Sequence, residues 1–255
     1  MRRLLITLLC SILLVSLARG GILTILTEQH AMTSQHATTV MDPQHATATA
    51  QANIILFDPL NQNIHHWYTD PPTAYAFKDG AYHITDDNDQ NGRASILSTN
   101  SFSGTIGYQL TMEEIAGNDA NANDSFGMIF RFSQQDNKKN KNGDPIITFY
   151  SFEVVNTKSG AYYFWKHDNT TPNNPWTLIQ DGKQPIGSEF HQGRGPQAVN
   201  TIKIFMNNDQ FTVTVNKTQL PKIFHDASLT QGMVGMIVNL RGTEVAFSNL
   251  LITRS

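Results

Sequence analysis

The sequence predicts an all-β domain whose antiparallel strands form two packed sheets, as in a sandwich or jelly roll. From Asn53 onward, short runs rich in Val, Ile, Phe, Tyr and Thr follow one another. Turn-forming Gly, Asn, Asp and Pro separate these runs, and no apolar stripe keeps a helical period over three turns. Because the runs number about a dozen, two sheets packed face to face are expected.

Each run has the length and composition of a strand. In order along the chain, the expected strands are 54–57, 74–77, 81–85, 94–99, 105–115, 125–133, 146–156, 161–167, 176–180, 200–207, 211–216, 233–240 and 243–253. Tight hairpin turns are expected at 79–80, 207–209 and 241–242, because Gly, Asn and Asp adopt the left-handed backbone conformations that such turns need.

The first twenty residues have the pattern of a secretory signal peptide. A short basic start, MRR, precedes an apolar run from Leu4 to Ala18 that ends in small residues of the kind a signal peptidase reads. Arg19 interrupts the run, so a membrane span of about twenty apolar residues would bury that arginine. We expect 1–20 to be a signal peptide, with an uncleaved N-terminal anchor as the alternative, and the domain to be secreted or held at the cell surface.

Residues 21–52 are expected to be a low-complexity linker. Gln-His-Ala occurs three times there, Thr, Ala and Gln dominate, and apolar periodicity is absent. The histidines are irregularly spaced, so no metal site is expected. The only cysteine, Cys10, lies in the N-terminal apolar run. The predicted domain at 53–255 therefore has no disulfide and depends on its own core.

Strand alternation assigns side chains to two faces in three of the predicted strands. The residues expected to face the core are Ile106, Tyr108, Leu110, Met112, Phe126, Met128, Phe130, Phe132, Tyr150, Phe152 and Val154. If these strands are neighbours, their opposite sides form one polar surface made of Gln109, Thr111, Glu113, Arg131, Ser151 and Glu153. An arginine between carboxylates can hold hydroxyl groups in fixed directions, as in a ligand platform. A salt-bridge ladder on a solvated face is the alternative.

Aromatic residues form a second candidate binding feature. In the strand AYYFWKH, either Tyr163 with Trp165 or Tyr162 with Phe164 must face away from the core. Aromatic rings beside polar groups stack on the apolar C–H faces of sugars. The alternative is that the outward pair packs under a nearby loop. Tyr163 and Trp165 join the polar residues as candidate ligand-binding residues.

The stretch DDNDQNG resembles the first half of an EF-hand calcium loop, with Asp87, Asp89 and Asn91 at ligand positions. An EF-hand needs a glutamate at the twelfth position, where this chain has Ser98, and helices on both sides. Two strand-like runs flank the stretch instead. The sequence therefore favours a polar turn over calcium binding by Asp87 and Asp89, and no metal or cofactor is expected.

Three long segments resemble a bacterial concanavalin A-like, laminin-G-like jelly-roll domain. They are LFDPLNQNIHHWYTDPPTAYAFKDGAYHI, FGMIFRF with YSFEVVNTKSGAYYFWKH, and GMVGMIVNLRGTEVAFSNLLI. The 3-keto-disaccharide hydrolase family shares this fold and a similar G-x-x-F-R strand. The resemblance covers nearly all of residues 54–254 and implies the fold. It implies no residue's role, because such domains serve as glycan binders, as extracellular parts of sensors and as enzymes.

Charge and motifs narrow the function classes. A net charge of -3 gives no basic surface for nucleic acid, and membrane contact is expected only through an uncleaved N-terminal segment. The chain has no H-E-x-x-H, G-x-S-x-G or phosphate-loop motif. We therefore expect a non-catalytic module that binds a glycan or cell-wall polymer. The alternatives are a glycoside hydrolase using Glu113 and Glu153, and a structural or protein-interaction domain.

Overall fold

The computed structural model describes residues 53–88, 92–118, 120–121, 123–171 and 173–254. The predicted signal segment at 1–20, the linker at 21–52 and the calcium-motif residue Asp89 lie outside these ranges. The described residues form strands, turns and bends without a helix. Accordingly, none of them belongs to a helix that could span a membrane. The prediction of an all-β domain is confirmed.

One layer is a nine-stranded antiparallel sheet in the order β13-β12-β11-β6-β16-β3-β2, with β1 paired to β16 and β14 to β12. Its strands are β1 (Ile54–Asp58), β2 (Tyr75–Lys78), β3 (Ala81–Thr85), β6 (Ile106–Ala116), β11 (Asn200–Asn207), β12 (Gln210–Val215), β13 (Thr218–Gln219), β14 (Phe224–His225) and β16 (Glu244–Arg254). The predicted turns after β2 and β11 are present, with positive φ at Asp79, Gly80 and Asn208.

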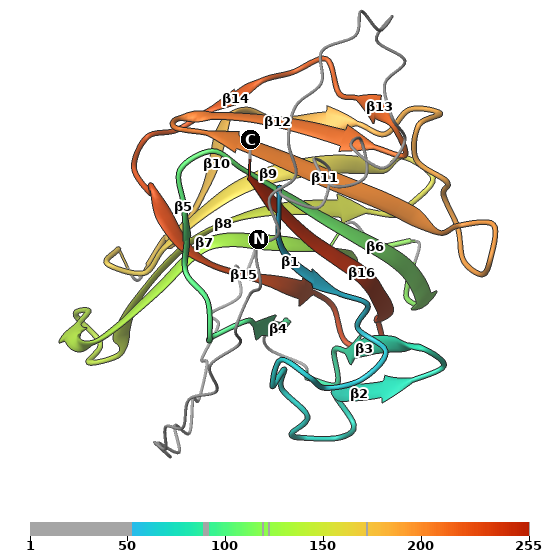
Figure 1. The fold of residues 1–255 in the computed structure, drawn as a ribbon, viewed down its shortest axis with the longest axis horizontal. Coiled ribbons are helices and arrows are strands. Elements are labelled where there is room, and N and C mark those ends of the chain that lie inside the picture. The colour runs from blue at the N-terminus through green and yellow to red at the C-terminus, as the bar shows by residue number, and fades with distance from the viewer. Residues whose placement is uncertain (1–52, 89–91, 119, 122, 172, 255) are drawn as a thin grey trace, which may run out of the picture. The chain divides into compact units, whose positions relative to one another are not determined.

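The other layer is a seven-stranded antiparallel sheet in the order β10-β9-β8-β7-β15-β4, with β5 paired to β15. Its strands are β4 (Arg93–Ile96), β5 (Phe102–Ser103), β7 (Ser125–Lys139), β8 (Pro145–Val155), β9 (Ala161–Asp168), β10 (Trp176–Pro185) and β15 (Gln231–Val238). Figure 1 shows the two layers, with β11, β12, β6 and β16 lying over β7 to β9.

The core lies between the sheets and is rich in aromatic rings. Phe211 on β12 meets Phe130, Tyr150 and Phe164 of the opposite sheet at centroid distances of 5.8, 5.2 and 5.2 Å. Buried tyrosines satisfy their hydroxyl groups across the same space: Tyr108 on β6 donates to the carbonyl of Gly235 on β15 at 2.8 Å. The two sheets therefore form a packed sandwich, as predicted.

The predicted core residues are buried in this sandwich with one correction, Phe132. A β-bulge falls between Phe130 and Ser133 on β7, and Arg131 within it has a φ of 52°. The bulge shifts the alternation by one residue. Phe132 consequently stacks on Phe149, which lies on the outer side of β8, instead of entering the main core.

The single polar surface expected from three neighbouring strands does not exist. β6 belongs to the nine-stranded sheet, whereas β7 and β8 pair with each other in the seven-stranded sheet. Gln109, Thr111 and Glu113 therefore lie on the outer side of one sheet, and Ser151 and Glu153 on the outer side of the other. The prediction that all six residues line one face is wrong, because alternation along a strand says nothing about which strands become neighbours.

Candidate functional site

The outer face of the seven-stranded sheet, termed here the aromatic face, carries side chains in three cross-strand rows. Their members follow from the register of β7 to β10: Gly127, Glu153, Tyr163 and Lys183 in the first, Ile129, Ser151, Trp165 and Leu178 in the second, and Phe149, His167 and Trp176 in the third. Paired residues of adjacent strands lie on the same side of a sheet. Four of the candidate residues, Ser151, Glu153, Tyr163 and Trp165, are thus brought together.

Tyr163 and Trp165 form a pair of parallel rings on β9. Their centroids are 5.7 Å apart and their planes differ by 5°. Both side chains are half-buried, and the ammonium of Lys183 lies 5.3 Å from the Tyr163 ring centre. Tyr162 and Phe164 occupy the core, which directs the intervening and following residues outward. The expectation that one of the two aromatic pairs faces away from the core is confirmed.

Glu153 is a buried carboxylate beside this ring pair. The hydroxyls of Ser151 and Ser125 donate to it at 2.6 and 2.8 Å, and the amide of Asn239 donates at 3.0 Å. Only 5% of Glu153 is exposed. Burial raises the pKa of Glu153, and the three hydrogen bonds oppose that shift. The carboxylate is held in one orientation, next to Tyr163 in the first row.

The raised pKa of Glu153 makes stability depend on pH with a defined sign. The folded protein keeps this proton to a higher pH than the unfolded chain, in which the pKa is near its ordinary value of 4.5. Glu153 therefore increases the free energy of unfolding at low pH, and this contribution disappears as the pH rises through the raised pKa. Glu153→Gln removes this titrating group. We therefore expect the free energy of unfolding of the wild type, minus that of the variant, to decrease as the pH rises.

Urea unfolding of both proteins, from about pH 4 to about pH 8, measures this difference. Asp168→Asn, at a half-buried site on the same sheet, serves as the control. Parallel pH profiles for wild type and Glu153→Gln would contradict the raised pKa.

The third row is an aromatic cluster that is absent from the predicted site residues. His167 stacks on Phe149 with 4.7 Å between centroids and meets the edge of Trp176 at the same distance. Burial lowers the pKa of His167 to about 4, and its Nδ1 has no hydrogen-bond partner. His167 is therefore a neutral ring at neutral pH. Its position two residues beyond Trp165 was a signal that it shares the outer side of β9.

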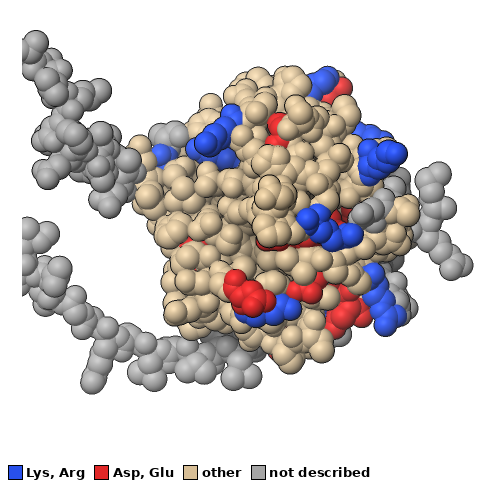
Figure 2. Space-filling view, turned by 90° about the vertical axis from the view of Figure 1, so that its right-hand side faces the viewer, with Lys and Arg blue, Asp and Glu red and all other residues tan. Residues whose placement is uncertain are grey.

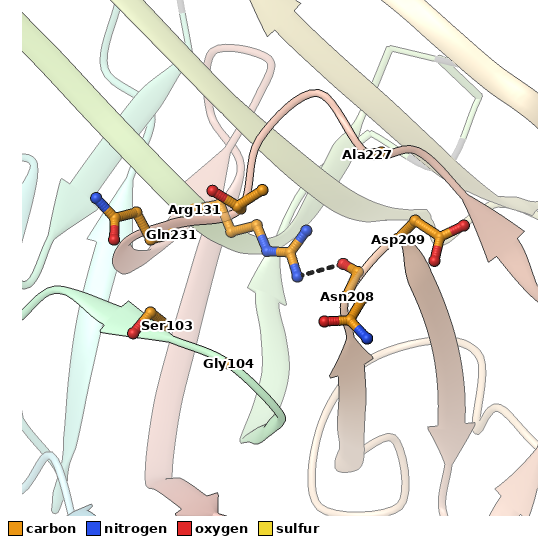
Figure 3. A pocket seen from close by; sticks show the side chains of 8 residues that line it. Ser103, Gly104, Arg131, Asn208, Asp209, Ala227 and Gln231 are labelled. Atoms are coloured by element: carbon orange, nitrogen blue, oxygen red, sulfur yellow. Dashed lines mark hydrogen bonds between the residues drawn. The ribbon is translucent and has the colours of Figure 1, made fainter.

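Arg131 lies apart from the aromatic face, at one end of the sandwich. The left-handed backbone at Arg131 directs its guanidinium over the ring of Phe211, 4.7 Å from the ring centre. It donates hydrogen bonds to the carbonyls of Leu229 and Asn208. A pocket of about 420 Å³ opens beside it. Figure 3 shows Arg131 reaching from β7 toward Asn208 across this pocket.

Asp87, the described residue of the calcium-like motif, is bonded within the protein. Asp87 accepts hydrogen bonds from Arg93 and from the Thr73 hydroxyl, which are typical of a closed turn. Within the described ranges, no three His, Cys, Asp or Glu residues gather as a metal site would require. On the face drawn in Figure 2, Lys and Arg side chains lie in separate small groups, some of them beside Asp or Glu. That face carries no basic stripe of the kind that binds nucleic acid.

No family model and no curated protein sequence matches the chain. Solved structures do match over most of its length. A Bacillus subtilis protein of unknown function with a galectin-like fold shares 11% identity and has a TM-score of 0.55, covering 79% of this chain and 96% of that one. The kappa-carrageenase of Pseudoalteromonas carrageenovora, solved with an oligotetrasaccharide of kappa-carrageenan, shares 9% identity and has a TM-score of 0.53, covering 80% and 94%. The domain is a concanavalin A-like jelly roll.

A third match supports the same fold. The β-glucanase of Bacillus licheniformis shares 9% identity with a TM-score of 0.51, and the alignment covers 78% of this chain and 97% of that one. Identities this low show the fold alone, so the function of this jelly roll has to be argued from its own side chains.

Proposed function

We propose that the domain is a non-catalytic carbohydrate-binding module and that its ligand lies on the aromatic face. The observation that carries the proposal is the parallel ring pair of Tyr163 and Trp165 on the outer side of β9. Sugar rings present apolar C–H faces that stack on aromatic rings, and hydroxyl rims that need fixed hydrogen-bond partners. Lys183, which is exposed at the end of the first row, supplies an additional donor.

The arrangement favours binding over hydrolysis. Glycosidases need two carboxyl groups that flank the scissile bond, about 5 to 10 Å apart. Glu113 and Glu153 lie in different sheets, so the pair considered from the sequence is not available. The cross-strand neighbours of Glu153 are Gly127 and Tyr163, neither of which is a carboxylate. Both oxygens of Glu153 already accept hydrogen bonds from the protein.

The structural matches support a saccharide as the ligand class. The kappa-carrageenase was solved with a bound oligosaccharide, and the Bacillus licheniformis protein is a β-glucanase. The proposal also retains export to the cell exterior, with 1–20 as signal or anchor, 21–52 as a spacer and 53–255 as the module. Polymers of the cell wall or of the surroundings would then be its partners.

A polysaccharide panel tests this function. Affinity electrophoresis against β-1,3-1,4-glucan, xylan, kappa-carrageenan and solubilised peptidoglycan is expected to show retardation by at least one polymer. Release of reducing sugar, measured in parallel, is expected to equal the background. Sugar release that Glu153→Gln abolishes would replace binding by catalysis as the function. Migration unaffected by every polymer would favour a structural or protein-interaction domain instead.

A further inference from the structure

Arg131 is a buried cation that forms no direct ion pair among the described residues, although Tyr150, Asp226 and Asp209 lie near enough to act on its charge. Its residue is 5% exposed, and burial lowers its pKa. Its two hydrogen bonds go to backbone carbonyls, those of Leu229 and Asn208. A guanidinium has five N–H donors, so donors remain for a ligand. Buried charges in proteins are normally paired, which makes this arginine an unusual element of the fold.

Arg131 lines the pocket at the end of the sandwich. Segments from both sheets line it: Ser103, Gly104, Arg131, Asn208, Asp209, Ala227, Thr230 and Gln231. Figure 3 shows Ser103 and Gly104 opposite the β11–β12 turn, with Gln231 beside Arg131. A volume of about 420 Å³ is within the range of small-molecule sites and accommodates one sugar residue. The hydroxyl and amide side chains around the rim can bind hydroxyl groups.

The backbone that presents Arg131 is strained and tightly supported. A left-handed φ of 52° at a long-chain residue is uncommon and costs on the order of 1 kcal/mol or more. Gly232 on β15 lies against the bulge, and a Cβ there would come within 2.4 Å of the Arg131 carbonyl carbon. Only glycine permits this approach. Strain that the surroundings enforce, at a bulge beside a pocket, is a common property of ligand sites.

We propose that this pocket is a second ligand site and that it binds the carboxylate of an acidic sugar, a hexuronate. The carboxylate forms a direct charge-assisted pair with Arg131, which Asp226 and Asp209 reach only from a longer distance, while the rim holds the sugar hydroxyls. Asp209 on the rim repels the ligand, but its side chain is half exposed and solvent screens its charge. The sugar part rests on the proposed carbohydrate function, whereas the carboxylate part rests on Arg131 alone.

Titration calorimetry with D-glucuronate and D-galacturonate tests the site, with D-glucose and D-galactose as matched neutral sugars. We expect saturable binding of a uronate and at least about tenfold weaker binding of its neutral counterpart, because a hydrogen bond to a charged group contributes about 1.5 to 3 kcal/mol. Arg131→Gln is expected to bind the uronate and its neutral counterpart with equal affinity. Equal binding of acidic and neutral sugars by the wild type, or no uronate binding, would overturn the proposal.

A second variant keeps the test decisive if Arg131→Gln fails to fold. Asp209→Asn removes a charge at an exposed turn and leaves the bonds of Arg131 intact. We expect it to tighten uronate binding, whereas weaker binding would mean that Asp209 holds hydroxyls of a neutral ligand and would refute the carboxylate site. Trp165→Ala separates the two proposals. The Trp165→Ala variant is expected to bind the uronate as the wild type does. Loss of uronate binding in this variant would place the uronate on the aromatic face.

Discussion

Phe164→Ala is expected to lower the free energy of unfolding by about 3 to 5 kcal/mol, the range for removing a buried aromatic ring. The Phe164 side chain is fully buried where the two sheets meet. It packs on Phe224 with 4.7 Å between ring centres and on Phe130 with 5.6 Å. No neighbouring element can collapse into the cavity without disturbing both sheets, so the loss should fall toward the upper part of that range.

Equilibrium unfolding in urea measures this loss, with Phe57→Ala as the matched control. Phe57 on β1 is 52% exposed, so the same chemical change there is expected to cost within about 0.5 kcal/mol. Equal costs at the two positions would contradict the assignment of Phe164 to the core between the sheets.

Trp165→Ala, one residue along the same strand, is expected to affect ligand binding strongly and stability only weakly. It should weaken polysaccharide binding by at least about tenfold, because truncating a central aromatic anchor of an interface typically costs 2 kcal/mol or more. The free energy of unfolding should change by only about 1 kcal/mol, since the ring is half-buried outside the main core.

Affinity electrophoresis with the polymer that retards the wild type measures this effect. Gln109→Ala is the control, since Gln109 lies on the outer side of the other sheet. Unchanged retardation of Trp165→Ala, or an equal loss in Gln109→Ala, would remove the ligand from the aromatic face.

Local sequence periodicity predicted the longer strands and most of the side-chain directions, but not the two-residue strands β5, β13 and β14. Strict alternation placed Tyr108, Phe152 and Val154 in the core, and the structure confirms each. It also required an outward aromatic pair on β9, found as Tyr163 with Trp165. These features depend on residues two apart in one strand, so they can be read without knowing the partners of that strand.

The candidate site was less predictable because it depends on contacts between distant segments. The single polar surface required β6 and β8 to be neighbours, whereas the chain places them in different sheets. The bulge at Arg131 fits only because Gly232, about a hundred residues later, has no side chain, and no property of β7 alone signals it. The pocket likewise combines four separate segments of the chain. Sheet membership and bulges are tertiary properties, which a single periodic pattern does not encode.

Tryptophan side-chain NMR tests the central claim, glycan binding by the aromatic face, most directly. The chain has three tryptophans, and each gives one indole N–H signal. Trp67 is buried in the core with its indole bonded to Asp58, whereas Trp165 and Trp176 lie on the aromatic face. On titration with an oligosaccharide of the retarding polymer, the Trp165 signal should shift saturably and the Trp67 signal should stay in place. Saturable binding that leaves Trp165 unshifted would contradict the account.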